Sequence, residues 1–152
     1  MADLTVGEAQ ITGLVDGEFI AGPEYFGPAA TFSGHEDLVA PDGKMHLPIG
    51  CFLIRKGRLA GRTVLVDAGL GEMSGDNFEG GALLKELSKA GSSTSSVDDI
   101  VISHLHIDHC GWLVDPDAQP IFENARIWIG AADWERFVEA GADVMLGSVR
   151  EG

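Results

Sequence analysis

A cluster of histidines that directly follows an apolar run limits what this chain can fold into more than any other feature. Ile100 to Ile102 (IVI) form the run, and the next seven residues, Ser103 to His109 (SHLHIDH), hold three of the five histidines of the chain. A short apolar run bounded by polar residues predicts a buried strand. A surface run of histidines is the alternative, but three imidazoles and one carboxylate within six positions favour a metal site.

The spacing inside the cluster suits two metal ions. Residues two apart on an extended segment point the same way, so His104 and His106 can bind one cation. Asp108 and His109 follow where the chain turns, and they offer a carboxylate and an imidazole to a second ion. A hydroxide shared between the two ions fits such a site. We therefore predict two divalent cations as cofactors, zinc in the first place, with iron, manganese or cobalt as alternatives.

Length and composition indicate a single mixed domain. The chain has 152 residues, which supports one domain over 1–152, and 45% of them are hydrophobic, enough for a buried core. The 21 glycines and 6 prolines favour many turns over a helical bundle. We expect a loop-rich fold in which helices cover a sheet.

Charge and cysteine usage limit the partners and the compartment. The net charge of −14 disfavours nucleic acid, whose binders need clustered Lys and Arg. No window has the roughly 18 apolar residues of a membrane span, and the first ten residues lack the pattern of a signal peptide. The two cysteines have no CxxC spacing, which fits a reducing compartment. We expect a cytoplasmic protein with a small-molecule substrate and no nucleic-acid or membrane partner.

Hydrophobic patterns and turn residues predict strands first, and then helices alternating with strands. Residues 4–20 predict two strands joined by a tight turn at Asp16-Gly17. The glycine- and proline-rich segment 21–47 predicts a long surface loop. The later elements expected are a hairpin of strands at 49–54 and 63–66, a helix over 81–90, strands near 100–102 and 125–129, and a helix over about 131–140, whereas 142–152 shows no period.

These residues resemble the metallo-β-lactamase-fold hydrolases, whose hallmark is an HxHxDH loop like that of residues 104–109. Thr63 to Gly71 (TVLVDAGLG) is similar to the strand of that family that ends in an Asp-x-Gly turn. Pro120 to Ile129, followed by Ala131 to Trp134, is similar to the strand and helix after the metal loop. The resemblance covers about residues 4–140 and implies an α/β fold of the α+β type, the N-terminal half of a metallo-β-lactamase αββα sandwich.

The resemblance also implies roles for the site residues. His104 and His106 would be ligands of the first metal, and Asp108 and His109 ligands of the second. Asp108 would also act in catalysis, by orienting the hydroxide and passing a proton to the leaving group. Asp67 would be an outer-shell acceptor that orients a ligand histidine.

Five residues also suit a structural role in place of a role in the site. Asp67 also suits a turn before Gly69. Trp112 is a candidate wall of the substrate pocket, and an ordinary core tryptophan is the other interpretation. Cys110 is expected to be a small buried hydrophobic residue, and His35 and His46 to be loop or surface histidines.

The resemblance implies that further ligands come from a C-terminal half, because no histidine follows His109. Two ligands per ion fall short of the three of catalytic zinc sites, so we expect the chain alone to bind metal weakly and to be inactive. The sheet face that packs on the second half would be an exposed apolar patch. Either the chain is part of a longer enzyme, which we prefer, or a homodimer buries that face.

The function implied by the resemblance is that of a metal-dependent hydrolase. The N-terminal elements are most similar to lactonase-like members of the quorum-quenching type, which implies a lactone or ester substrate. Thioester hydrolysis of the hydroxyacylglutathione type and phosphoester hydrolysis stay open. The alternative from another class is a truncated, non-catalytic remnant or assembly partner that binds metal weakly.

Overall fold

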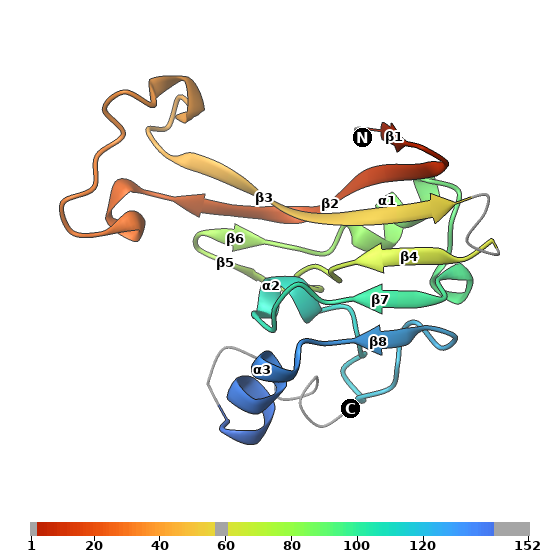
Figure 1. Cartoon of the computed structure of the whole chain (residues 1–152). Helices are drawn as coiled ribbons and strands as arrows, with labels where there is room; N and C mark the ends of the chain where they lie inside the picture. The colour runs from red at the N-terminus through yellow and green to blue at the C-terminus, as the bar shows by residue number, and fades with distance from the viewer. Residues whose placement is uncertain (1–2, 57–60, 142–152) are drawn as a thin grey trace.

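The centre of the computed structural model, which describes residues 3–56 and 61–141, is a long antiparallel pair of strands. β2 (Ala9–Ala21) pairs with β3 (Met45–Lys56), and β1 (Asp3–Val6) folds back on the start of β2. Both long strands are rich in β-branched and aromatic residues, which favour extended backbone. Figure 1 shows the pair crossing the upper part of the molecule, with β1 above it and the strands from β4 to β8 below it.

The sheet is mixed, and the described strands number eight, in the order β5-β6-β2-β3-β4-β7-β8, with β1 also on β2. The strand β4 pairs antiparallel with β3, whereas the pairs β4–β7 and β7–β8 are parallel. The remaining strands are β4 (Thr63–Val66), β5 (Ser74–Gly75), β6 (Phe78–Glu79), β7 (Asp99–Val101) and β8 (Arg126–Trp128). A mixed sheet with few helices confirms the predicted fold class.

Helices are short, and both predicted ones are present. The predicted helix 81–90 is α1 (Leu83–Lys89), and the predicted helix 131–140 begins as α3 (Ala131–Asp133) and continues as the π-helix η4 (Trp134–Glu139). The other helical turns are η1 (Pro23–Phe26), η2 (Glu36–Leu38), η3 (Thr94–Ser96) and α2 (Ile107–Cys110). No helix in the described ranges is long and apolar enough to cross a membrane. The tail 142–152 lies outside the described residues.

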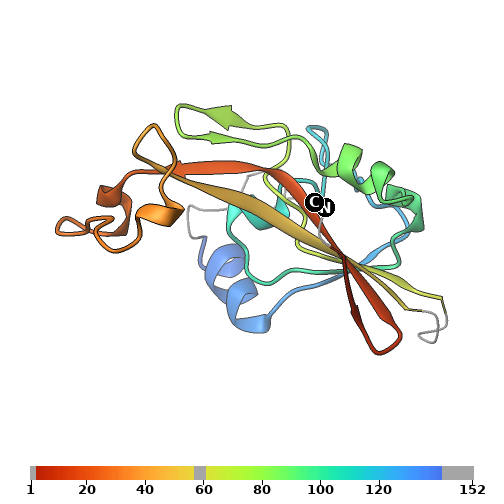
Figure 2. The same ribbon diagram turned by 90° about the horizontal axis from the view of Figure 1, so that it is seen from above.

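The core lies on the face of the sheet that α1 covers. Leu53, Leu65 and Ile100 stand opposite one another on β3, β4 and β7, and all three are fully buried. Leu83 and Leu87 of α1 belong to the same buried cluster. Figure 2 shows α1 on one side of the β2–β3 pair. Burial of these side chains is therefore what fixes α1 against the sheet.

The opposite face of the sheet carries an exposed apolar row. Phe52, Val66, Val101 and Trp128 are register partners across β3, β4, β7 and β8. Phe52 is 49%, Val101 40% and Trp128 53% exposed. Side chains alternate between faces along a strand, so the residues next to the buried Leu53, Leu65 and Ile100 point to this face. The exposed apolar face predicted from the sequence is present in this row.

The prediction of a turn at Asp16-Gly17 is wrong, because β2 runs through both residues and the turn to β1 lies at Gly7-Glu8. Asp16 is instead the extra residue of a β-bulge between Val15 and Gly17. Its carboxylate is buried among hydrogen-bond donors, so a dipeptide typical of turns is accommodated inside a strand. The predicted loop 21–47 is also shorter, since β3 begins at Met45.

Candidate metal centre

Asp67 and Ser103 meet because the two strands that precede them are parallel neighbours. β4 ends at Val66 and β7 at Val101, so both chains leave the sheet at the same edge. Asp67 has φ 61°, a left-handed conformation that Asp tolerates better than most residues. The turn and outer-shell interpretations of Asp67 are therefore compatible, since the turn conformation directs its carboxylate at the next loop.

The carboxylate of Asp67 accepts hydrogen bonds from the loop that carries the histidines. Its Oδ1 accepts from the backbone N–H of Ser103 at 2.7 Å, and its Oδ2 accepts from the Ser103 hydroxyl at 2.8 Å. The same Oδ2 lies 2.9 Å from Nδ1 of His109. Asp67 is thus in contact with one of the four predicted ligands, which is the contact that an outer-shell acceptor needs.

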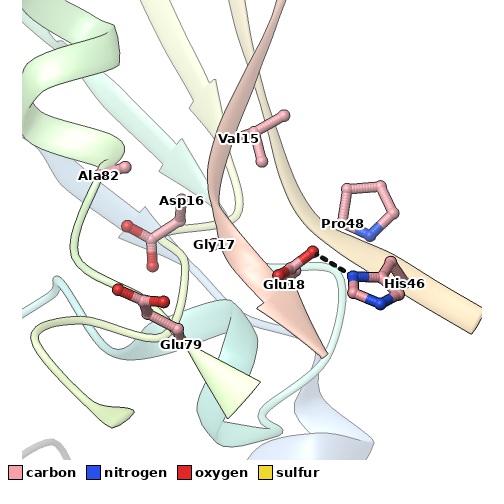
Figure 3. Close-up of a pocket in the computed structure, with 9 residues that line it drawn as sticks. Val15, Asp16, Gly17, Glu18, His46, Pro48, Glu79 and Ala82 are labelled. Carbon is pink, nitrogen blue, oxygen red and sulfur yellow. Dashed lines mark hydrogen bonds and ion pairs between the residues drawn. The ribbon is translucent and has the colours of Figure 1, made fainter. Parts of the chain in front are cut away.

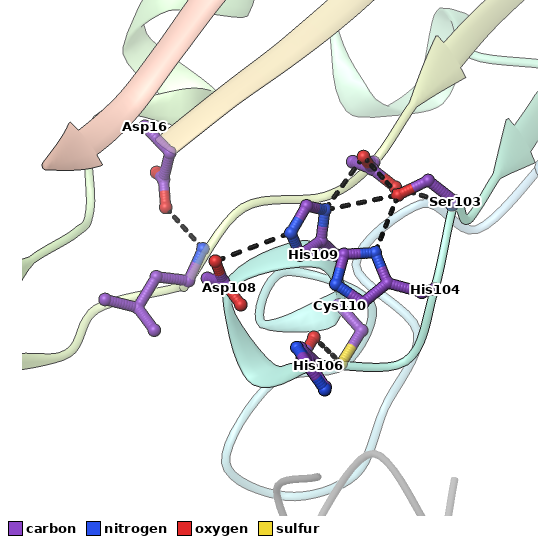
Figure 4. Close-up of polar contacts among 9 residues, drawn as sticks. Asp16, Ser103, His104, His106, Asp108, His109 and Cys110 are labelled. Atoms are coloured by element: carbon purple, nitrogen blue, oxygen red, sulfur yellow. Dashed lines mark hydrogen bonds and ion pairs between the residues drawn. The ribbon is translucent and has the colours of Figure 1, made fainter. Parts of the chain in front are cut away.

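The histidine rings of the loop pack against one another in tilted and edge-to-face arrangements. The ring centroids of His104 and His109 are 3.9 Å apart, and those of His104 and His106 are 4.6 Å apart. Asp108 Oδ2 lies 3.4 Å from His109 Nε2. Figure 4 shows Ser103, His104 and His109 joined by polar contacts, with Asp108 on the far side of His109. The structure therefore brings the four predicted ligands together, while their binding of metal stays a prediction.

The hydroxyl of Ser103 contacts both His104 and His109. Its Oγ is 3.1 Å from Nδ1 of His104 and 3.3 Å from Nδ1 of His109. These contacts occupy the Nδ1 side of both rings. The opposite ring nitrogen, Nε2, is then the atom that each ring can present to a cation, and that of His109 faces Asp108, the other predicted ligand of its pair.

Burial, hydrogen bonds and neighbouring charges shift the pKa values of the residues in the cluster. The contacts of His109 with Asp108 and then with Asp67 raise the pKa of the His109 imidazole to about 9. Burial, followed by the nearby charge of His109, lowers the pKa of His104. Burial alone would raise the pKa of Asp67, but the hydrogen bonds from His109 and Ser103 outweigh it and hold that pKa below its usual range. The cluster therefore favours a charged Asp67 and a neutral His104 at pH 7.

The thiol of Cys110 lies in the short helix α2, which follows the first two histidines of the loop. The helix begins after His106, whose carbonyl accepts a hydrogen bond from the Cys110 thiol at 3.2 Å. Burial raises the pKa of Cys110 to about 12, so the group is a thiol and not a thiolate at neutral pH. The fully buried Cys110 occupies the position of a small hydrophobic residue, as predicted.

Imidazole and carboxylate groups are suitable donors for zinc, iron, manganese or cobalt, so the chemistry of the cluster fits the predicted cations. The number of donors fits only in part. Within residues 3–56 and 61–141, no group of three or more His, Cys, Asp or Glu side chains is arranged to hold a metal ion. Two pairs of ligands, His104 with His106 and Asp108 with His109, are what this loop can supply.

A cavity of about 300 Å³ opens beside Asp108. It is lined by residues from the C-terminal end of β2, the N-terminal part of β3, the strand β6 and the start of α2. Phe19 and Tyr25 both line it and pack on each other, with ring centroids 4.8 Å apart. Its other lining side chains are mostly apolar and include Phe19, Leu47, Ile49, Phe78 and Ile107. The sequence did not predict this cavity, because its walls come from segments separated by up to about 90 residues, and no local pattern marks them.

Trp112 lies in the core, and His46, predicted to be a loop or surface histidine, is exposed. Trp112 is 7% exposed and belongs to the core cluster, and it also borders a separate cavity of about 350 Å³. His46 is exposed in β3, and its ring lies 3.0 Å from Glu18 Oε2 and 3.1 Å from Asp42 Oδ2. Figure 3 shows His46 and Glu18 beside a cavity of about 510 Å³. His35 is exposed after the loop turn at Gly34, as expected of a surface histidine.

Comparison with known families and structures points in one direction. A family model described as the Metallo-beta-lactamase superfamily matches residues 47–148. This range includes the Asp67 turn, the histidine loop and β8. No protein of the curated set is significantly similar to the chain.

Several solved structures share the fold. AidC, described as a dizinc quorum-quenching lactonase in complex with a product, is 27% identical with a TM-score of 0.77, and the match covers 92% of this chain and 48% of AidC. The hydrolase AbOPH is 25% identical with a TM-score of 0.77, covering 91% and 47%. A probable metal-dependent hydrolase from Staphylococcus aureus is 19% identical with a TM-score of 0.75, covering 91% and 52%. The chain therefore spans about half the length of the solved structures that it matches.

Proposed function

The chain belongs to the metallo-β-lactamase superfamily, and from this premise we propose that it supplies the metal-binding half-site of a hydrolase that opens lactones or esters of small molecules. The observation that carries the proposal is the single loop, 104–109, in which the four predicted ligands cluster beside an apolar cavity. The lactonase description of AidC, at 27% identity, supports the substrate class.

We assign the four ligands in two pairs. His104 and His106 would hold one divalent cation, and Asp108 and His109 the other. When bound, the cations would supply a nucleophile at neutral pH by lowering the pKa of water. Asp67 and the Ser103 hydroxyl hold the rings of His104 and His109 by their Nδ1 atoms, so both rings are oriented before a ligand arrives.

Asp108 is proposed to act on the substrate as well. Its side chain is 42% exposed and lines the apolar cavity, so a molecule in that cavity touches Asp108 directly. The contact with His109 holds the pKa of Asp108 below its usual range, which keeps it a charged acceptor at pH 7. A charged carboxylate can orient an attacking water and then relay its proton to the leaving oxygen.

The cavity favours an ester or lactone that carries an apolar chain. Most side chains of its wall are apolar, with Asp108 and Tyr25 as the exceptions, and burying one methylene contributes about 0.8 kcal/mol. A small-molecule partner in the cytoplasm, with no nucleic acid and no membrane, remains part of the proposal, supported by the net charge of −14.

Thioesters and phosphoesters are the alternative substrates. A weakly metal-binding, non-catalytic role is the second candidate, favoured by the two donors per ion within the described loop.

The test is His106→Ala in the longest native form of the protein, with His35→Ala as the matched control. Metal content and turnover are measured with an acylated homoserine lactone, an aryl ester, a thioester and a phosphoester. We expect His106→Ala to lose both metal and turnover, because His106 lies in the ligand cluster, while the exposed His35 lies outside it. Unchanged turnover and metal content in His106→Ala would sink the proposal, and turnover of the phosphoester or thioester alone would replace the substrate class.

A further inference from the structure

Five hydrogen-bond donors from three separate segments converge on the carboxylate of Asp16, which is 1% exposed. Oδ2 accepts from the backbone N–H groups of Leu70 at 2.7 Å and Gly71 at 3.2 Å. Oδ1 accepts from the backbone N–H groups of Gly81 and Leu83, at 3.2 and 2.7 Å. It also accepts from the indole Nε1–H of Trp112 at 2.8 Å. A buried carboxylate is costly without donors, and these five offset that cost.

The backbone is shaped to approach this carboxylate closely. Gly69 has φ +59°, and a Cβ added there would lie 2.5 Å from Asp16 Oδ2. A Cβ on Gly80 would lie 3.2 Å from the same oxygen. Figure 3 shows Asp16 pointing from β2 towards the segment that leads into α1, away from the Glu18–His46 pair. Asp16 therefore joins β2 to the segment after Asp67 and to the start of α1.

The segment after Asp67 is in turn bonded to the histidine loop. The backbone N–H of Ala68 donates to the carbonyl of His109 at 2.8 Å, and that of Trp112 donates to the carbonyl of Ala68 at 2.9 Å. The N–H of Gly111 donates to the carbonyl of Gly69 at 2.7 Å. Residues 68–69 and 109–112 thus form one small hydrogen-bonded unit. Asp16 holds this unit from both sides, through Leu70 and Gly71 on one segment and Trp112 on the other.

We propose that Asp16 is a positioning residue of the metal centre, which fixes the backbone carrying His109 against the backbone carrying Asp67. The inference rests on the proposed function, because it concerns the same ligand loop. Asp16 itself touches neither substrate nor metal. Its effect passes through Trp112 and the 68–71 segment to the distance between Asp67 and His109, which sets the orientation of the His109 ring.

The experiment uses Asp16→Asn in the longest native form of the protein, with Co²⁺ as the probe. Asparagine keeps the size of the side chain but turns one acceptor oxygen into a donor that faces other donors. The control is Thr12→Val, since Thr12 is a buried polar residue on the same strand and the same face, and its hydroxyl donates to Asp3 Oδ1 at 2.8 Å. Measurements are Co²⁺ affinity, the visible absorption of bound Co²⁺, and hydrogen exchange of the Trp112 indole without metal.

If Asp16 positions the ligands, Asp16→Asn weakens Co²⁺ binding about tenfold, changes the visible spectrum and speeds exchange of the indole. Thr12→Val lowers thermal stability but leaves affinity and spectrum as in the wild type. Trp112→Phe, which removes a single donor and keeps an aromatic ring, gives a smaller loss of affinity in the same direction, and it decides the question if Asp16→Asn does not fold.

Wild-type affinity and spectrum in a folded Asp16→Asn protein, or in Trp112→Phe where the first variant does not fold, would overturn the inference. So would a loss in Thr12→Val that equals the loss in Asp16→Asn, because both would then reflect stability alone. Failure of the proposed function is a different result, since it would appear in the wild type as an absence of Co²⁺ binding and of lactone turnover.

Discussion

Asp67 Oδ2 lies 2.9 Å from His109 Nδ1, although the two residues are 42 positions apart in the chain. The contact exists because β4 and β7 are parallel neighbours, so the loops that follow them start at the same edge of the sheet. Through this contact Asp67, a turn residue with left-handed backbone, orients a predicted metal ligand.

We expect Asp67→Asn to weaken Zn²⁺ binding by about 10- to 100-fold, because partners of ligand histidines contribute to metal affinity on this scale. Asn also tolerates the left-handed backbone at φ 61°, so the turn should survive. Competition with a chromophoric chelator measures the affinity. Asp76→Asn is the matched control, since Asp76 is exposed in the β5–β6 turn and undergoes the same change of charge. Equal affinities in the two variants would remove Asp67 from the site.

The second prediction concerns the hydroxyl of Ser103. Ser103→Ala removes the contacts with Asp67 and with Nδ1 of His104 and His109, so both rings should sample more orientations and tautomers. Nitrogen NMR of the histidine side chains would record mixed tautomers in Ser103→Ala, together with about tenfold weaker Zn²⁺ binding. Ser103→Thr keeps a hydroxyl and should restore both readouts. A threonine variant as poor as the alanine variant would assign the effect to packing instead.

Chain-length preference tests the apolar cavity beside Asp108. Leu47→Trp should partly fill the cavity and lower kcat/KM for long acyl chains more than for short ones. Each methylene that loses its place costs about 0.8 kcal/mol, or about fourfold in kcat/KM. Leu38→Trp is the control, since Leu38 is exposed in η2 and outside the cavity wall. The measurement is kcat/KM across a series of acyl lengths. An equal loss of kcat/KM at all lengths would show that the acyl chain does not bind in this cavity.

Stability should depend on pH through His46. The hydrogen bonds with Asp42 and then Glu18 raise the pKa of His46 above its ordinary value of about 6.5. A raised folded pKa means that the contribution is complete below about pH 6.5 and is lost as the pH rises through the folded pKa. Urea unfolding of wild type and His46→Gln between about pH 5.5 and 8.5 should therefore show a gap that closes at high pH. A gap that widens with pH would contradict the assignment, and His35→Gln, a change at an exposed loop histidine, is the control.

The exposed apolar row predicts self-association of the isolated 152-residue chain. Phe52, Val101 and Trp128 lie side by side on one face, and exposed apolar patches of this kind drive association. Sedimentation should show a concentration-dependent mass, which Phe52→Thr shifts towards the monomer because threonine also favours strands. Tyr25→Thr is the control, as Tyr25 is an even more exposed aromatic residue, at 63%, and lies outside the row. A monomer at all concentrations would remove the homodimer as an explanation.

Local patterns determined several parts of this protein. The histidine loop, the apolar runs of β3, β4 and β7 and the helical period of α1 are all readable from residues within about ten positions, because spacing along a strand or helix decides which side chains share a face. The loop 104–109 could therefore be identified as a metal-site candidate before any coordinates. The class of fold followed from the same patterns and from the family resemblance.

Long-range contacts were decided only by the tertiary structure. Asp16-Gly17 is typical of a turn, yet it lies inside β2, because the buried carboxylate of Asp16 finds its donors at Leu70, Leu83 and Trp112. Similarly, the cavity wall joins Phe19 to Ile107, and no local spacing connects them. Hydrogen bonds and burial between distant segments carry free energies that a short window of sequence does not contain. The sequence thus determined which side chains could bind a metal, and the packing of the sheet decided which groups hold them in place.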